Sequence, residues 1–145
     1  MPYRLVSEVI ENRKCLSISA RTSVRQAAQL MKTHRVSALM VLGATGVLIG
    51  ICTERDLVFD VLADGLNPDQ TSVSAIMTAN PQTITAEKPF GHALHIMFEG
   101  GFRHVPVVDG QGRPVGMISA RDALDSEALN FDADLIRREE ITLAL

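Results

Sequence analysis

One short polar motif occurs twice in this chain. "TERD" spans residues 53–56 and "SARD" spans residues 119–122, each directly after an apolar run. A helix that begins at such a Thr or Ser offers free N–H groups and a positive dipole end, which suit an anion such as phosphate. The Arg adds paired N–H donors for phosphate, and the Asp can accept two hydrogen bonds from a vicinal diol. A ribose 5′-phosphate offers both partners at once. The candidate residues are Thr53, Arg55, Asp56, Ser119, Arg121 and Asp122.

The same motif also has a simpler structural interpretation. T-x-x-D and S-x-x-D resemble a helix capping box in which Asp replaces Glu. A cap alone stabilises a helix by about 1 kcal/mol and needs no ligand. Capping does not require Arg at the same position twice, nor a Gly three residues before each cap, where Gly50 and Gly116 stand. The residues alone therefore leave ligand binding and capping open.

The motif is part of a longer internal repeat. Residues 15–58 align without a gap to residues 81–124 after a shift of 66 positions, with nine identical pairs. Each copy contains a short extended piece, a helix with apolar residues at i, i+3, i+4 and i+7, two strands joined by a Gly-containing turn, and a second helix. We therefore predict a β-α-β-β-α unit that occurs twice, over residues 5–66 and 72–128, followed by a helical tail at 129–145.

Composition limits the class of protein. The chain has 145 residues, of which 46% are hydrophobic, and a formal net charge of -3. The negative charge argues against a nucleic-acid partner. No apolar run reaches the roughly 18–20 residues that span a bilayer, and the first residues lack a signal-peptide core. Cys15 and Cys52 have no C-x-x-C spacing, so neither a disulfide framework nor a zinc site is expected. We expect a soluble, cytoplasmic protein without a membrane partner.

The paired units resemble a tandem pair of CBS domains, also called a Bateman module. The resemblance rests on "HRVSAL" followed by "GVLIGICTERDL", and on "RHVPVVD" followed by "GMISARD". It covers about residues 5–128; Met40 departs from the family's usual Pro after "SAL", which Pro106 keeps. The resemblance implies an α/β (α+β) fold in which two units pack sheet to sheet with pseudo-twofold symmetry. It also implies two clefts that bind adenine nucleotides, and a homodimer of two such pairs.

The resemblance further implies which residues line each cleft. The motif Asp would bind ribose hydroxyls, and the Ser or Thr and the Arg would approach the phosphates. The remaining positions precede each unit's first strand or open its middle strand. The first cleft is then built on Thr53, Arg55 and Asp56 and completed by Ser37, Ala38, Gln82, Phe102 and Arg103. The second cleft is built on Ser119, Arg121 and Asp122 and completed by Leu16, Val36, Ser37, Arg103 and His104. Because it gains two basic residues, the second cleft is expected to bind more tightly.

These features predict a regulatory module that senses AMP, ADP or ATP and transmits a conformational change to an unknown protein partner. NAD is an alternative ligand because it contains an ADP moiety, and a structural dimerisation module with vestigial clefts is another reading. The sequence has no evident nucleophile–base pair, metal cluster or G-x-x-x-x-G-K-[ST] loop, so we expect no catalytic residues, metal or cofactor. Apolar helix faces that exceed one small core predict a homodimer.

Overall fold

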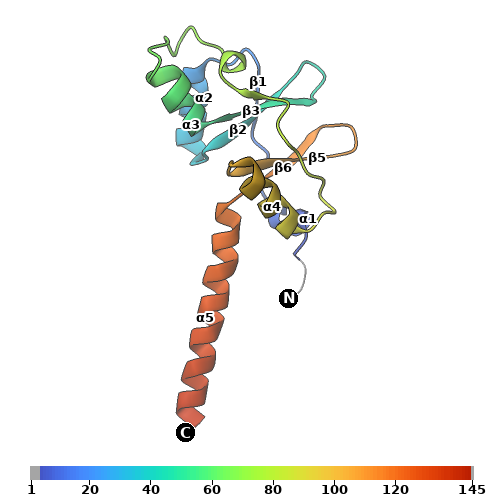
Figure 1. Cartoon of the computed structure of the whole chain (residues 1–145), viewed down its shortest axis with the longest axis vertical. Helices are drawn as coiled ribbons and strands as arrows, with labels where there is room; N and C mark the ends of the chain where they lie inside the picture. The colour runs from blue at the N-terminus through green and yellow to red at the C-terminus, as the bar shows by residue number, and fades with distance from the viewer. Residues whose placement is uncertain (1–3, 145) are drawn as a thin grey trace.

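A computed structural model describes residues 4–144 (Figure 1). The first half of the chain forms α1 (Val6–Ile10), β1 (Ser17–Ser19), α2 (Val24–His34), β2 (Ala38–Leu42), β3 (Leu48–Thr53), α3 (Glu54–Asp56) and η1 (Leu57–Leu62), of which η1 is a π-helix. The second half forms the short 3₁₀ helix η2 (Val73–Ala75), β4 (Thr78–Ala79), α4 (Phe90–Gly100), β5 (His104–Val108), β6 (Pro114–Ser119) and α5 (Arg121–Ala144).

Each unit contains its own small sheet. In the first unit the strand order is β1-β2-β3-β4, with β1 parallel to β2 and the other neighbours antiparallel. In the second unit β5 pairs antiparallel with β6. In the second unit, a single parallel bridge between Ile84 and Val107 takes the place of the β1–β2 pairing of the first unit. The predicted mixed α/β class and the repeated order of elements are confirmed, although the extended piece before α4 makes only that one bridge.

The first helices of the two units, α2 and α4, are built alike. Each buries one face, as the i, i+3, i+7 spacing of apolar residues predicts. Each ends at a residue in the left-handed region, Arg35 with φ 53° in the first unit and Gly101 with φ 71° in the second. The buried residues are Val24, Ala27 and Met31 in α2, and Phe90, Ala93 and Met97 in α4.

The helices that follow the two motifs differ. After Thr53, the three-residue α3 passes into the π-helix η1. After Ser119, α5 continues for 24 residues and projects away from the body (Figure 1). The expected boundary between the second repeat and the tail therefore lies inside one helix, and Leu145 lies outside the described residues. Despite the length of α5, none of the described helices is both long and apolar enough to cross a membrane.

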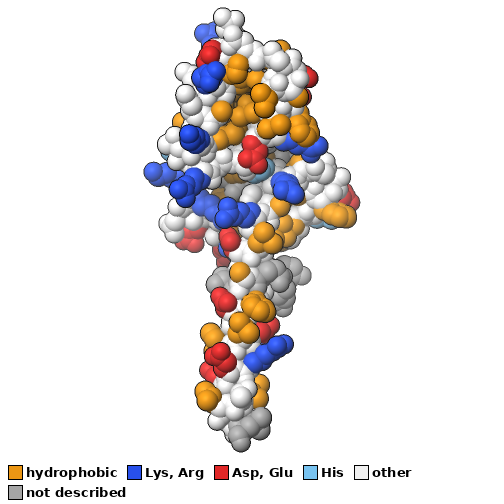
Figure 2. All heavy atoms as spheres, turned by 90° about the vertical axis from the view of Figure 1, so that its left-hand side faces the viewer, with side chains coloured by type: hydrophobic (Ala, Val, Ile, Leu, Met, Phe, Trp, Pro, Cys, Tyr) orange, Lys and Arg blue, Asp and Glu red, His pale blue; other side chains and the backbone are white. Residues whose placement is uncertain are grey.

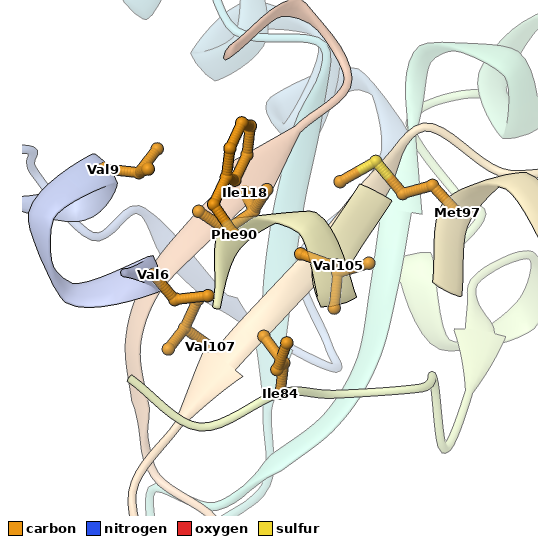
Figure 3. Close-up of a cluster of buried hydrophobic side chains, with 9 residues drawn as sticks. Val6, Val9, Ile84, Phe90, Met97, Val105, Val107 and Ile118 are labelled. Carbon is orange, nitrogen blue, oxygen red and sulfur yellow. The ribbon is translucent and has the colours of Figure 1, made fainter. Parts of the chain in front are cut away.

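The two hydrophobic cores exchange their leading segments. α1 precedes the first unit in sequence, yet Val6 and Val9 pack in the core of the second unit (Figure 3). η2 precedes the second unit, yet Val73 packs in the core of the first. The predicted repeat boundaries therefore divide the chain into consecutive segments, but the segment that begins each repeat packs in the hydrophobic core of the other repeat. The other members of the second core are Ile84, Phe90, Ala93, Met97, Val105, Val107 and Ile118.

This exchange explains the Gly that precedes each motif by three residues. The leading segments cross directly over β3 and β6, with Met77 against Gly50 and Ile10 against Gly116. A Cβ atom added to Gly116 would lie 2.9 Å from the Cβ of Ile10, closer than real Cβ contacts. The two glycines therefore have a packing role, and their recurrence is not an argument for ligand binding.

Candidate functional site

Two clefts lie between the units and are related by the same shift of 66 positions as the sequence repeat. Each cleft combines the motif of one unit with residues that open the middle strand of the other unit. The backbone framework is therefore shared, and the side chains differ. The equivalent pairs, first cleft then second, are Thr53/Ser119, Arg55/Arg121, Gln82/Leu16, Phe102/Val36, Arg103/Ser37 and His104/Ala38.

The grouping of these residues differs from the expected one at five positions. Ser37 and Ala38 line the second cleft and do not line the first. Arg103 lines the first cleft and reaches only a hollow that adjoins the second. His104 borders both clefts. Asp122 lines neither cleft, whereas Asp56 lines the first. The clefts are thus assembled by pseudo-symmetry, which assigns Arg103 to the cleft opposite its own motif.

The first motif forms a complete capping box. The backbone N–H of Thr53 donates to Asp56 Oδ2 at 2.8 Å, and the backbone N–H of Asp56 donates to Thr53 Oγ1 at 3.3 Å. None of the described residues donates to Asp56 Oδ1, and this carboxylate borders the cleft. The guanidinium of Arg55 stacks over Phe59, with its Cζ 5.0 Å from the ring centroid. The cap and a ligand-facing oxygen therefore coexist on Asp56.

In the second motif, both oxygens of the Asp side chain are occupied. The backbone N–H of Ser119 donates to Asp122 Oδ2 at 2.8 Å, and Arg13 Nη2 donates to Asp122 Oδ1 at 2.6 Å. This hydrogen bond raises the pKa of Arg13 above its usual value, although burial opposes the shift. Asp122 is buried, with 5% of its surface exposed. Its carboxylate is thus committed to the protein in this structure.

Arg13 was missed by the sequence reasoning. It lies before the aligned repeat, 109 positions from Asp122, and it reaches the second motif only because α1 packs on the second unit. The signal that points to it is the crossing of the leading segments, which a single sequence does not reveal. Lys14 and Arg35, which also line the second cleft, were missed as well.

His104 forms a link between the clefts. Its Nε2 lies 3.0 Å from Ser37 Oγ, so the hydrogen bond joins β5 of one unit to the start of β2 in the other. Burial lowers the pKa of His104 below its usual value, and Arg103 lowers it further, while Glu54 and Asp122 oppose the shift. At neutral pH this side chain is therefore neutral, so it adds no positive charge to either cleft.

The positive charge of the second cleft comes from other residues. Among the described residues, its lining includes the cations Arg13, Lys14, Arg35 and Arg121 and no carboxylate. The lining of the first cleft includes two arginines and the carboxylate of Asp56. Figure 2 shows Lys and Arg side chains gathered across the middle of the body, between an apolar area and the projecting helix. The second cleft is therefore the more positive, as expected, but for a different reason.

The second cleft is large enough for a small ligand when the adjoining hollow is counted with it. The first measures about 200 Å³ and the second about 220 Å³. The hollow beside the second cleft, which shares Ser37, His104, Ser119 and Arg121 with it, adds about 510 Å³. Cofactor sites in proteins typically measure roughly 300–1,000 Å³. The second cleft together with this hollow falls within that range.

Comparison with known proteins identifies relatives of the same architecture. The family model of the CBS domain matches residues 6–62 and 73–128. A CBS domain-containing protein of Arabidopsis thaliana is 42% identical over 96 residues, which are 66% of this chain and 17% of the plant protein. The chain spans between 17% and 24% of the length of the five Arabidopsis relatives that it matches.

Two solved structures of similar shape contain adenosine derivatives. The CBS domain pair of protein MJ0100, in complex with 5′-methylthioadenosine and S-adenosyl-L-methionine, has a TM-score of 0.80 and 26% identity, over 89% of this chain and 99% of that chain. A CBS domain protein of Pyrobaculum aerophilum complexed with AMP has a TM-score of 0.76 and 26% identity, over 82% of this chain and 89% of that chain.

Proposed function

Because this chain belongs to the CBS domain family, we propose that it is a regulatory module that binds an adenine nucleotide between its two units. The observation that carries the proposal is the pair of equivalent clefts, each combining a motif Arg with side chains of the opposite unit. The adenosine derivatives bound to two structural neighbours support an adenosine-containing ligand. The capping geometry does not compete with this function, since Asp56 Oδ1 accepts no hydrogen bond from the described residues.

In the first cleft, three kinds of contact would hold a nucleotide. Phe102 offers an aromatic face, and stacking of a base on such a face contributes about 1–3 kcal/mol. Asp56 Oδ1 would accept a hydrogen bond from the ribose diol. Arg55 would leave Phe59 and, with Arg103, contact the phosphate. In the second cleft the ribose would meet Asp122 only if Arg13 moved away, so the cations there act mainly on phosphate.

The module would transmit its signal through elements attached to the clefts. Arg121 lines the second cleft and also begins α5, which projects from the body (Figure 1). The hydrogen bond between His104 and Ser37 joins the two units at the wall between the clefts. A ligand that changes the distance between the units would therefore act on both features. The partner that reads this change would be a protein.

We also propose that the module is a homodimer. An apolar groove of about 470 Å³ runs between α2 and η1, and the exposed faces of Val58, Phe59 and Leu62 lie beside it on η1. Leu62 is 76% exposed, which is unusual for a large apolar side chain on a short helix. A second copy packed on this groove would remove that surface from water. The apolar part of its lining consists of Val24, Ala28, Leu57, Val61, Leu62, Leu66 and Pro68.

Calorimetry and thermal unfolding test the proposed ligand. The full chain is titrated with AMP, ATP, NAD and S-adenosyl-L-methionine, and each mixture is analysed for products. A ligand at 100 times its Kd stabilises the fold by about 2.7 kcal/mol, which raises Tm by several degrees. Tighter binding of NAD than of AMP or ATP would favour the NAD alternative. Binding of none of them would leave a structural dimerisation module, and turnover would indicate an enzyme.

A further inference from the structure

We propose that the second cleft selects a ligand with two or more phosphates, whereas the first cleft accepts a ligand with at most one. This inference rests on the proposed function for the adenosine part of the ligand. The charge argument itself depends only on the residues of the two clefts. Among the described residues, the second cleft is lined by four cationic side chains, one of them paired with Asp122, and by no carboxylate. The first cleft is lined by two cationic side chains and one carboxylate.

Comparison of the repeats isolates the source of this difference. Arg13, Lys14 and Arg35 line the second cleft. The equivalent of Arg35 in the repeat is Gly101, and the segment that leads into the second unit, residues 77–82, contains no Lys or Arg, whereas the segment after α1 has Arg13 and Lys14. Arg121, the remaining cation, has the equivalent Arg55. Three cations are thus present in the segments that line the second cleft and absent from the matching segments of the first. For Arg35 and Gly101 the difference lies at equivalent backbone positions, since both end a helix in the left-handed region.

Arg35 stands where the backbone favours glycine. It ends α2 with a φ of 53°, and its equivalent at the end of α4 is Gly101 with a φ of 71°. The left-handed conformation after a helix is usually filled by Gly, or by Asn, because other side chains are crowded there. The local backbone therefore does not account for Arg at this position. Its guanidinium lines the second cleft, which gives the side chain a role there.

The cations of the second cleft are available to a ligand. Among the described side chains, Lys14, Arg35 and Arg121 form no ion pair. The contact between Arg13 and Asp122 uses one nitrogen of a guanidinium that has five N–H donors. Each further phosphate of a ligand adds negative charge and acceptor oxygens, and charge-assisted hydrogen bonds are about twice as strong as neutral ones. A diphosphate or triphosphate can contact more of these cations than a monophosphate can.

Titration of the full chain with ATP, AMP, adenosine and inorganic tripolyphosphate tests the inference. The test variant is Lys14→Gln combined with Arg35→Asn, because Asn tolerates the left-handed backbone. The matched control is Lys88→Gln combined with Arg113→Gln, which removes the same charge outside both clefts. Circular dichroism and Tm establish that each variant is folded before it is titrated.

At the second cleft, we expect ATP and tripolyphosphate to bind the parent protein at least roughly tenfold more tightly than adenosine or AMP does. In the test variant, both should lose roughly tenfold or more in affinity, while AMP changes by less than about threefold. In the control pair, all affinities should stay within about twofold, since both side chains are exposed to screening solvent and line neither cleft.

Different failures separate the two proposals. If AMP and ATP bind equally and the test variant changes neither, the polyphosphate selectivity is overturned and the proposed nucleotide function stands. If the test and control variants lose equal affinity, the selectivity is also overturned, because net charge alone then explains the binding. If tripolyphosphate binds and depends on Lys14 and Arg35 but adenosine adds nothing, the polyphosphate pocket is supported and the nucleotide function fails.

Discussion

Arg13 Nη2 lies 2.6 Å from Asp122 Oδ1 and ties the segment after α1 to the first turn of α5. Of the two side chains, that of Arg13 is 38% exposed and that of Asp122 is 6% exposed. Removing Arg13 would leave the buried carboxylate of Asp122 without its charged partner, whereas the more exposed Arg13 would be solvated in the absence of Asp122. The pair therefore holds the leading segment against the second motif and keeps one oxygen of Asp122 occupied.

We expect Asp122→Ala to reduce the free energy of unfolding by about 2 kcal/mol, because it removes the hydrogen bonds that Asp122 accepts from the Ser119 N–H and from Arg13. Asp56→Ala is the matched control at the equivalent position. It loses only a cap and should cost about 1 kcal/mol. Urea unfolding at neutral pH measures both. Equal losses in the two variants would mean that the ion pair adds nothing to stability.

Asp56 should be the more important of the two carboxylates for binding a ribose. It lines the first cleft with one oxygen free of protein donors in the described structure, whereas Asp122 lines neither cleft. Asp56→Asn is expected to weaken AMP binding roughly tenfold, because one hydrogen bond between a charged acceptor and the diol is lost. Calorimetry compares it with Asp122→Asn. A larger loss in Asp122→Asn would place the ribose in the second cleft and contradict this assignment.

The stability of the fold should depend on pH through His104. Its folded pKa lies below the usual value of about 6.5, so near that pH the unfolded chain binds more protons than the folded chain. The contribution of neutral His104 to folding stability is fully present above pH 6.5. It is lost as the pH falls from 6.5 through the pKa of His104 in the folded protein. The free energy of unfolding should decrease between pH 7.5 and 5.5, and less so in His104→Asn. The same pH dependence in both proteins would assign it to other groups.

If the protein is a homodimer through the apolar groove, a charged substitution on η1 should disrupt the dimer. Leu62→Asp places a charge on the exposed apolar surface beside the groove between α2 and η1 and should convert dimer to monomer at micromolar concentration. Val115→Asp changes another partly exposed apolar residue, on β6, and should leave the dimer intact. Sedimentation velocity distinguishes the two states. A parent protein that sediments only as a 15.8 kDa species would contradict the proposal.

Much of the fold could be predicted from the sequence because the signals are local. The apolar spacing of α2 and α4, the hairpins and the capped motifs each depend on residues within a few positions of one another. The exchange of leading segments could not be predicted in this way. It depends on which core Val6 and Val73 enter, and nothing near them in the chain decides that. The π-helix η1 likewise has no clear local signal.

The candidate site was predictable where it follows the repeat and not where it depends on long-range contacts. The two motifs were found from their repetition, and the residues that open the middle strands were implied by the resemblance to the CBS family. Arg13 was missed because it reaches Asp122 across 109 positions, and the lowered pKa of His104 could not be foreseen because its burial is a tertiary property. Arg103 was expected in both clefts; it lines the first and the hollow beside the second, and its counterpart Ser37 lines the second.

Crystals of the full chain grown with AMP and with ATP would test the central claim most directly. The account predicts electron density for an adenine nucleotide in at least one cleft, with its phosphate beside Arg55 and Arg103 or beside Arg121 and Lys14. Clefts that remain without nucleotide density at millimolar AMP and ATP, or a nucleotide bound elsewhere on the molecule, would contradict it.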